Sequence, residues 1–104
     1  MPLRTPTTIT QGGLSNAALD VLGHEFMAEQ ASALGLAGER VCKALDRLKA
    51  HAGEGAERAA LVKAASEAVY GYFIQRELCG FRRHDDVIRE YAIPRAVLAR
   101  LGAR

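Results

Sequence analysis

The sequence predicts an all-α protein, a long antiparallel helical hairpin plus two short C-terminal helices, dimerising into a helical bundle. Apolar residues recur at three- and four-residue steps through residues 16–51 and 56–79, as on one face of an amphipathic helix. Residues 52–55, with two glycines, separate these segments, and no segment has the character of a strand. A length of 104 residues suits one domain. We therefore expect a single helical domain over residues 15–104.

The first 14 residues are expected to form a flexible tail. Residues 1–13 contain two prolines, four threonines and a Gly-Gly pair without apolar periodicity, so they cannot bury enough surface to offset their ordering entropy. They contain no apolar run typical of a signal peptide, and no later segment is apolar enough for a membrane span. These features favour a cytoplasmic protein without membrane contact. Ser15 or Asn16 then offers an N-cap for the first helix.

The first helix is predicted over residues 16–51. Gly35 and Gly38 lie inside it, and each costs on the order of 1 kcal/mol relative to alanine. The two glycines indicate a kink, a break into two helices, or a place where another helix comes close. The apolar stripe that periodicity predicts to be buried comprises Leu19, Leu22, Phe26, Ala33, Ala37, Val41, Leu45 and Leu48.

The second helix is predicted over residues 56–79, after a connector whose glycines suit a tight reversal. Its end, residues 69–79, is apolar on nearly every side, which is typical of a helix covered from several directions. Gly80 is the expected C-terminal cap of this helix.

Two short helices are predicted at the C-terminus. The first covers residues 86–91, with His84 or Asp85 before it. Ile93 and Pro94 end it, because a residue before proline avoids the helical region. Pro94 suits the first turn of the last helix, which continues to residue 101.

The short connector predicts the register of the hairpin, and it predicts that the beginning of the first helix, the arm, is left uncovered. Residues whose numbers sum to about 107 should face each other, which leaves residues 16–27 beyond the second helix. An unbroken first helix would be about 54 Å long, whereas a compact domain of this size has a radius of gyration near 13 Å. Either the chain bends at residues 35–38 or a second copy covers the arm. We favour a homodimer forming a four-helix bundle.

The same register separates the two cysteines. Cys42 and Cys79 would lie roughly 21 Å apart along the hairpin axis, too far for a disulfide within the chain. We expect free thiols in a reducing compartment.

The best polar cluster of the sequence is Glu25 and Glu29 on the first helix, facing Gln75, Arg76 and Glu77 across the hairpin. Glu29 interrupts the apolar stripe, and a carboxylate there requires a basic partner such as Arg76. One interpretation is a site for a ligand or for proton transfer. The other, which we favour, is a structural ion pair that fixes the register of the two helices.

The sequence lacks the patterns of the common helical enzymes. A di-iron bundle needs Glu-x-x-His pairs, and neither Glu25 nor the histidines provide one. No serine or cysteine lies in a recognised nucleophile motif, and no metal or cofactor is expected. Enzymatic activity is therefore not predicted.

The C-terminal quarter is basic. Residues 76–104 contain seven arginines and four acidic residues, while the whole chain has a net charge of +2. The alternative function is therefore a small nucleic-acid-binding protein, with Arg95 and Arg100 at the bases and Arg82 and Arg83 at the phosphates. Against it, the last helix contains no Asn, Gln, Ser or Thr to read base edges.

Three segments carry a resemblance to a known family: residues 72–80 (YFIQRELCG), 87–94 (VIREYAIP) and 97–102 (VLARLG). They resemble a family of short uncharacterised bacterial all-helical proteins, described as a domain of unknown function. The resemblance covers residues 15–102 and implies a bacterial, cytoplasmic helical protein, without any site to transfer. Together with the residue patterns it favours a non-enzymatic protein acting through self-association or protein–protein interaction.

Overall fold

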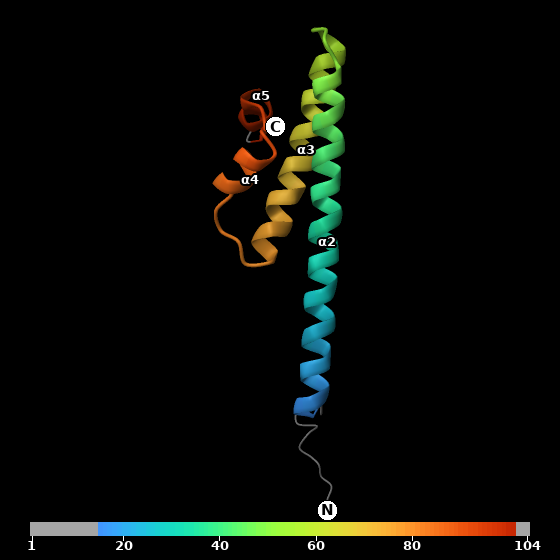
Figure 1. Cartoon of the computed structure of the whole chain (residues 1–104), viewed down its shortest axis with the longest axis vertical. Coiled ribbons are helices and arrows are strands. Elements are labelled where there is room, and N and C mark those ends of the chain that lie inside the picture. Colours follow the sequence, from blue (N-terminus) through green and yellow to red (C-terminus); the bar gives the residue numbers. More distant parts are fainter. Residues whose placement is uncertain (1–14, 102–104) are drawn as a thin grey trace, which may run out of the picture. The chain divides into compact units, whose positions relative to one another are not determined.

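A computed structural model describes residues 15–101, which form helices and turns. The helices are α2 (Asn16–Ala50), α3 (Ala56–Leu78), α4 (Asp85–Glu90) and α5 (Arg95–Arg100) (Figure 1). The predicted order of two long and two short helices is confirmed, and each bound lies within one residue of its predicted position. The predicted tail, residues 1–14, lies outside the described residues. No helix in the described part of the chain is long and apolar enough to cross a membrane.

The described residues divide into two units, a first unit that ends at Ala31 and a second unit that begins at Ser32. In the first unit the described residues form the beginning of α2, where the Ser15 hydroxyl accepts a 3.1 Å hydrogen bond from the Ala18 amide. Of the two N-cap residues that the sequence offered, Ser15 and Asn16, Ser15 is therefore the cap. Nearly every side chain from residue 15 to 31 is exposed, and five large apolar ones are 48–67% exposed: Leu19, Val21, Leu22, Phe26 and Met27.

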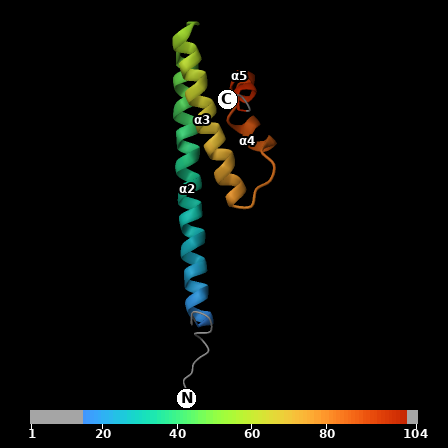
Figure 2. The same ribbon diagram turned by 180° about the vertical axis from the view of Figure 1, so that it is seen from behind.

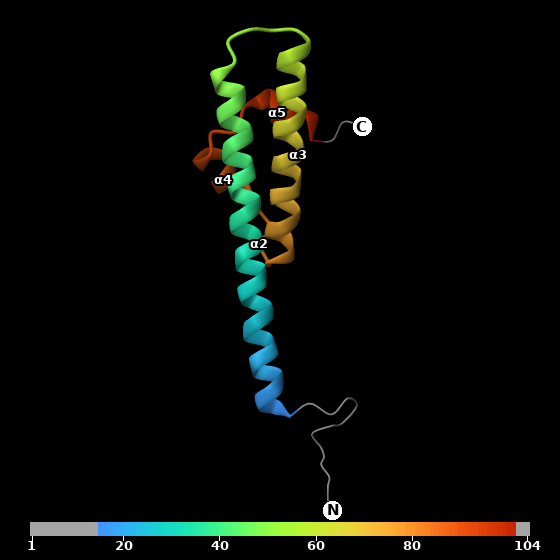
Figure 3. The same cartoon turned by 90° about the vertical axis from the view of Figure 1, so that its right-hand side faces the viewer.

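The second unit contains the helical hairpin. In Figure 3, α3 runs antiparallel to the second half of α2, and residues 51–55 connect them. Leu36 shares one groove with Gly71, and Arg40 shares it with Glu67. The predicted register places residues 67–74 opposite residues 33–40, which agrees with the segments of α3 and α2 that line this groove.

The core of the second unit includes residues from all four helices and from the α4–α5 turn. Val41, Leu48, Val69 and Val97 are its most deeply buried large side chains. Figure 2 shows α4 and α5 beside α3, and α5 packs directly against α3. The buried cluster comprises Val41, Ala44, Leu45, Leu48, Ala65, Val69, Tyr72, Val87, Ile93 and Val97.

Two similar turns direct the chain from α3 back to the hairpin. At the end of α3, Gly80 has φ 102°, and the Phe81 amide donates to the Arg76 carbonyl at 2.9 Å. At the end of α4, Ala92 has φ 51°, and the Ile93 amide donates to the Ile88 carbonyl at 3.0 Å. Both bonds belong to the Schellman motif, in which a left-handed residue ends the helix. Gly80 has the capping role that the sequence predicted.

The helix α2 continues through Gly35 and Gly38 without a break. Gly38 is buried, and a Cβ added to it would lie 3.3 Å from the Tyr91 hydroxyl and 3.5 Å from Cε1 of Tyr72. Gly35 has no such neighbour within 4 Å. Of the three alternatives, close approach of another element is therefore correct for Gly38.

Candidate functional site

Arg76 is the most deeply buried charged residue of the described chain, with its side chain 7% exposed. Its Nε donates to Nδ1 of His84 at 3.0 Å, and its Nη2 donates to the Arg83 carbonyl at 2.9 Å. A longer contact of 3.4 Å joins Nη2 to Asp86. The guanidinium also lies 4.6 Å from the centre of the Phe81 ring, within the range of a cation–π interaction. Arg76 thus ties the end of α3 to the loop and helix that follow.

His84 completes this arrangement, which we call the Arg76 cluster (Glu77, Phe81, His84 and Asp86 around Arg76). An arginine Nε can only donate, so Nδ1 of His84 must be the acceptor and carry no proton. Nε2 then carries the proton and donates to Glu77 at 3.1 Å. The imidazole stacks on the Phe73 ring with 4.1 Å between ring centres. These contacts hold the imidazole ring in place, and the cluster joins the end of α3 to α4.

Beside the Arg76 cluster lies a shallow concave surface of about 560 Å³. Arg82, Arg83 and Arg89 line it together with Asp85 and Asp86. Arg83 and Asp85 form an exposed ion pair of 2.7 Å. The hydrogen bond from Arg83 and its positive charge hold the pKa of the Asp85 carboxyl below the usual value. The surface therefore combines both signs of charge.

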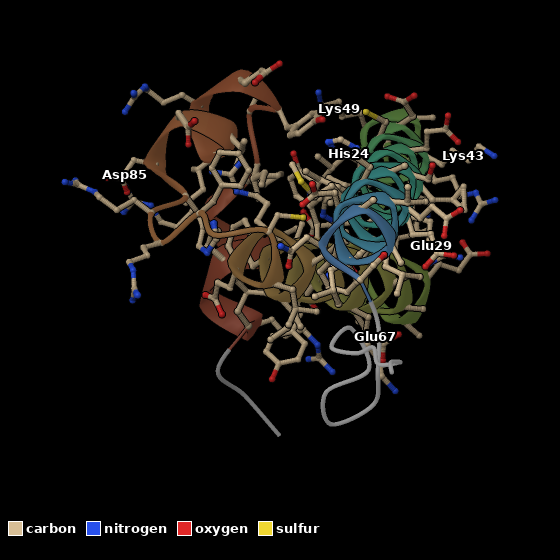
Figure 4. All side chains as sticks on the ribbon, turned by 90° about the horizontal axis from the view of Figure 1, so that it is seen from below. His24, Glu29, Lys43, Lys49, Glu67 and Asp85 are labelled. Atoms are coloured by element: carbon tan, nitrogen blue, oxygen red, sulfur yellow. The ribbon has the colours of Figure 1, made fainter. Side chains whose placement is uncertain are left out.

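The four arginines of the nucleic-acid prediction are all exposed. Arg82 and Arg83 lie in the loop before α4, and Arg95 and Arg100 lie at the two ends of α5. Asp85, beside Arg83, is labelled in Figure 4 on the side of the second unit away from Lys43. Contact of these arginines with nucleic acid stays a prediction.

The predicted polar cluster is distributed over both units. Glu25 and Glu29 are exposed residues of the first unit, while Gln75, Arg76 and Glu77 are on α3 in the second. The hydrogen bonds described for Arg76 go to residues 83–86, and Glu77 binds His84. Pairing of Arg76 with Glu29 stays a prediction.

Sequence reasoning did not find the partners of Arg76. His84, Asp86 and the Phe81 ring reach it because the turn at Gly80 reverses the chain immediately after α3. The only signal in the sequence was Gly80 itself, which predicted the end of the helix but not what the loop would contact.

A second surface feature is a groove of about 290 Å³ between α2 and α3. We call it the α2–α3 groove. Small residues make its floor and Leu36 contributes an apolar side chain that is 50% exposed. Its lining includes Leu36, Ala37 and Arg40 from α2, and Glu67, Gly71 and Gln75 from α3.

The rings of Tyr72 and Tyr91 lie next to Gly38. The rings of Tyr72 and Tyr91 meet edge to face with 5.7 Å between their centres. A hydrogen bond with Tyr72, together with burial, raises the pKa of Tyr91 to about 12. This pair holds the α4–α5 turn against α2 and is part of the core.

The described residues include possible metal ligands and two cysteines. In residues 15–101 no three histidine, cysteine or acidic side chains lie close enough together to hold a metal ion. Cys42 and Cys79 are both free thiols, as predicted from their spacing.

Comparison with known proteins gives a family without a known activity. No curated protein and no solved structure matches the chain. A family model described as a family of unknown function (DUF6665) matches residues 1–104, which confirms the resemblance to a family of unknown function. Since the match spans the whole sequence, the chain belongs to this family of unknown function, DUF6665.

Proposed function

We propose that this is a non-enzymatic helical protein that acts by associating with another protein chain. The partner that we propose first is a second copy of the same chain. The observation that carries the proposal is the exposure of the beginning of α2. Leu19, Leu22 and Phe26 recur on one helical face and are 50%, 48% and 60% exposed.

The stability of the helix by itself does not explain why its apolar face is exposed. Most helical stability in proteins comes from packing of an apolar face. Residues 16–31 place that face in solvent. Covering it with a second chain would supply the missing packing, and a symmetric dimer is the commonest assembly that does so.

Light scattering coupled to size-exclusion chromatography tests the proposal. We expect the mass of a dimer at micromolar concentrations, and dissociation on dilution. Phe26→Gln should shift the equilibrium toward monomer, because it removes apolar area from the exposed face. His24→Gln is the matched control, since His24 is an exposed residue on the opposite face of the same turns. A monomeric wild-type protein at these concentrations would contradict the proposal.

Nucleic-acid binding is the alternative function. The exposed Arg82, Arg95 and Arg100 support it. Asp85 and Asp86 oppose it, because they line the same concave surface as Arg82. The test is binding of a labelled duplex at two salt concentrations. Phosphate contacts must weaken as salt increases, and an Arg95→Ala, Arg100→Ala variant should bind less tightly if α5 is involved. Binding that is absent at low salt removes this alternative.

A further inference from the structure

The protein has an exposed apolar helix face and an open groove. The helix is the first part of α2, with the apolar face formed by Leu19, Leu22 and Phe26. The groove is the α2–α3 groove of the second unit, in which Leu36 is half exposed and Gly71 has no neighbour within 4 Å of a built Cβ. Small residues such as Gly71 allow another helix to approach closely.

The exposed helix is acidic, and the α2 side of the groove is basic. Residues 15–31 contain three carboxylates, Asp20, Glu25 and Glu29, and neither lysine nor arginine. The groove has a basic residue on its α2 side, Arg40, and an acidic residue on its α3 side, Glu67. Complementary potentials of this kind select one partner surface over others.

We propose that the beginning of α2 in one copy docks in the α2–α3 groove of a second copy, and that the second copy docks in the same way in the first. This inference rests on the self-association proposed above and names the two surfaces that carry it. The contact is reciprocal, so it closes as a two-fold dimer and leaves no free end for further growth.

Helical periodicity determines the orientation of the docked helix. Glu25 and Glu29 border the apolar face on the side of Leu22. Arg40 lines the groove from α2, and the exposed Lys43 follows it three residues later on the same helix. When the docked helix runs antiparallel to the receiving α2, its acidic edge lies beside Arg40 and Lys43. In the parallel orientation the same edge would face Glu67 on α3. A two-fold axis across the helices also makes the two α2 helices antiparallel, so charge and symmetry require the same orientation.

A charge exchange tests this contact directly. The helix variant is Glu25→Lys, Glu29→Lys, and the groove variant is Arg40→Glu, Lys43→Glu. All four residues are exposed, so both variants should keep the fold, which circular dichroism checks. Each variant alone places like charges against each other at both contacts. We expect each to weaken dimerisation at least tenfold, roughly the minimum for such repulsion.

The mixture of the two variants gives the decisive result. At a concentration where each is monomeric, an equal mixture should form a dimer containing one of each, because both contacts then join opposite charges. Light scattering gives the mass, and native mass spectrometry gives the composition. A mixture that stays monomeric overturns the docking.

A steric variant tests the groove without changing charge. Gly71→Gln fills the groove where a side chain meets open space, so the monomer should fold while the dimer weakens. Gly35→Gln is the matched control, since Gly35 is an exposed α2 glycine with equally open surroundings, on the face away from the groove. If wild type dimerises but neither the charge variants nor Gly71→Gln weakens it, the docking is wrong and self-association stands. If wild type is monomeric, both are wrong.

Discussion

Nε of Arg76 donates a 3.0 Å hydrogen bond to Nδ1 of His84. The bond joins a buried arginine of α3 to the residue that precedes α4, and the Arg83 carbonyl accepts a second bond from the same guanidinium. A chain of 104 residues thus fixes its C-terminal helices with one buried cation as well as with apolar contacts. Several properties of the protein should depend on this connection.

Arg76→Met should destabilise the fold. Methionine keeps much of the apolar stem but leaves Nδ1 of His84 and the Arg83 carbonyl without their donor, and each such loss costs roughly 1–3 kcal/mol. Urea unfolding followed by circular dichroism measures the change. The control is Arg82→Met, an exposed arginine of the adjacent loop, for which we expect a change within about 0.5 kcal/mol. Equal stability of the two variants would show that the Arg76 cluster does not hold the loop.

The tautomer of His84 is a second, more local prediction. Because Nδ1 accepts from Arg76, the proton should reside on Nε2, which donates to Glu77. Nitrogen NMR of the imidazole distinguishes the two neutral tautomers. We expect the Nε2–H form in wild type and a mixture in Arg76→Met. A dominant Nδ1–H form in wild type would contradict the arrangement.

The sequence was sufficient for the helices because their ends depend on local residues. Ser15, Gly55, Gly80 and Pro94 determine where helices begin or end through capping and backbone restriction, and these effects act over a few positions. The register of the hairpin followed from the short connector.

The surroundings of Arg76 could not be predicted in the same way. Its partners are seven to ten residues along the chain, and they reach it only through the path of the loop after Gly80. Periodicity indicates which face of α3 is buried but not which later side chain will cover it. The sequence proposed Glu29 as the partner of Arg76, and that pairing, like dimerisation, still requires an experiment.

Substitutions at the left-handed residues of the two Schellman turns should change the free energy of unfolding in opposite directions. Gly80→Ala should lower the free energy of unfolding by about 1–2 kcal/mol, because a side chain is strained in the left-handed region. Ala92→Gly should raise it, because Ala92 already has φ 51°, with the gain reduced by the greater freedom of glycine in the unfolded chain. Thermal and urea unfolding of both variants measure the changes. If both variants change the free energy of unfolding in the same direction, backbone conformation does not determine the effect of the substitution at one of the two turns.

The helical glycines of α2 give another matched pair. Gly35→Ala should stabilise the protein by about 0.5–1 kcal/mol, the usual gain when alanine replaces glycine inside a helix, since its surroundings are open. Gly38→Ala should gain less or lose stability, because its Cβ would press on the Tyr91 hydroxyl at 3.3 Å. The comparison requires only unfolding curves of the two variants. An equal gain at both positions would mean that Tyr91 moves aside without cost.

Tyr91 should make the protein sensitive to alkali. Its pKa is raised from 10.0 to about 12 by the hydrogen bond with Tyr72 and by burial, so the folded state prefers the neutral phenol. Between these values the unfolded chain loses the phenolic proton while the folded chain keeps it. The stabilisation is therefore fully present below pH 10 and is lost as the pH rises toward 12.

Tyr91→Phe separates this effect from general alkaline unfolding. The variant should be less stable than wild type below pH 10 by about 0.5–1.5 kcal/mol, the usual net value of one hydrogen bond. It has no phenol at position 91 to ionise, so its stability should fall less steeply between pH 10 and 12. Urea midpoints measured across this range give both curves. The curves should converge as the pH rises, and curves that stay parallel would show that the Tyr72–Tyr91 hydrogen bond does not control the ionisation.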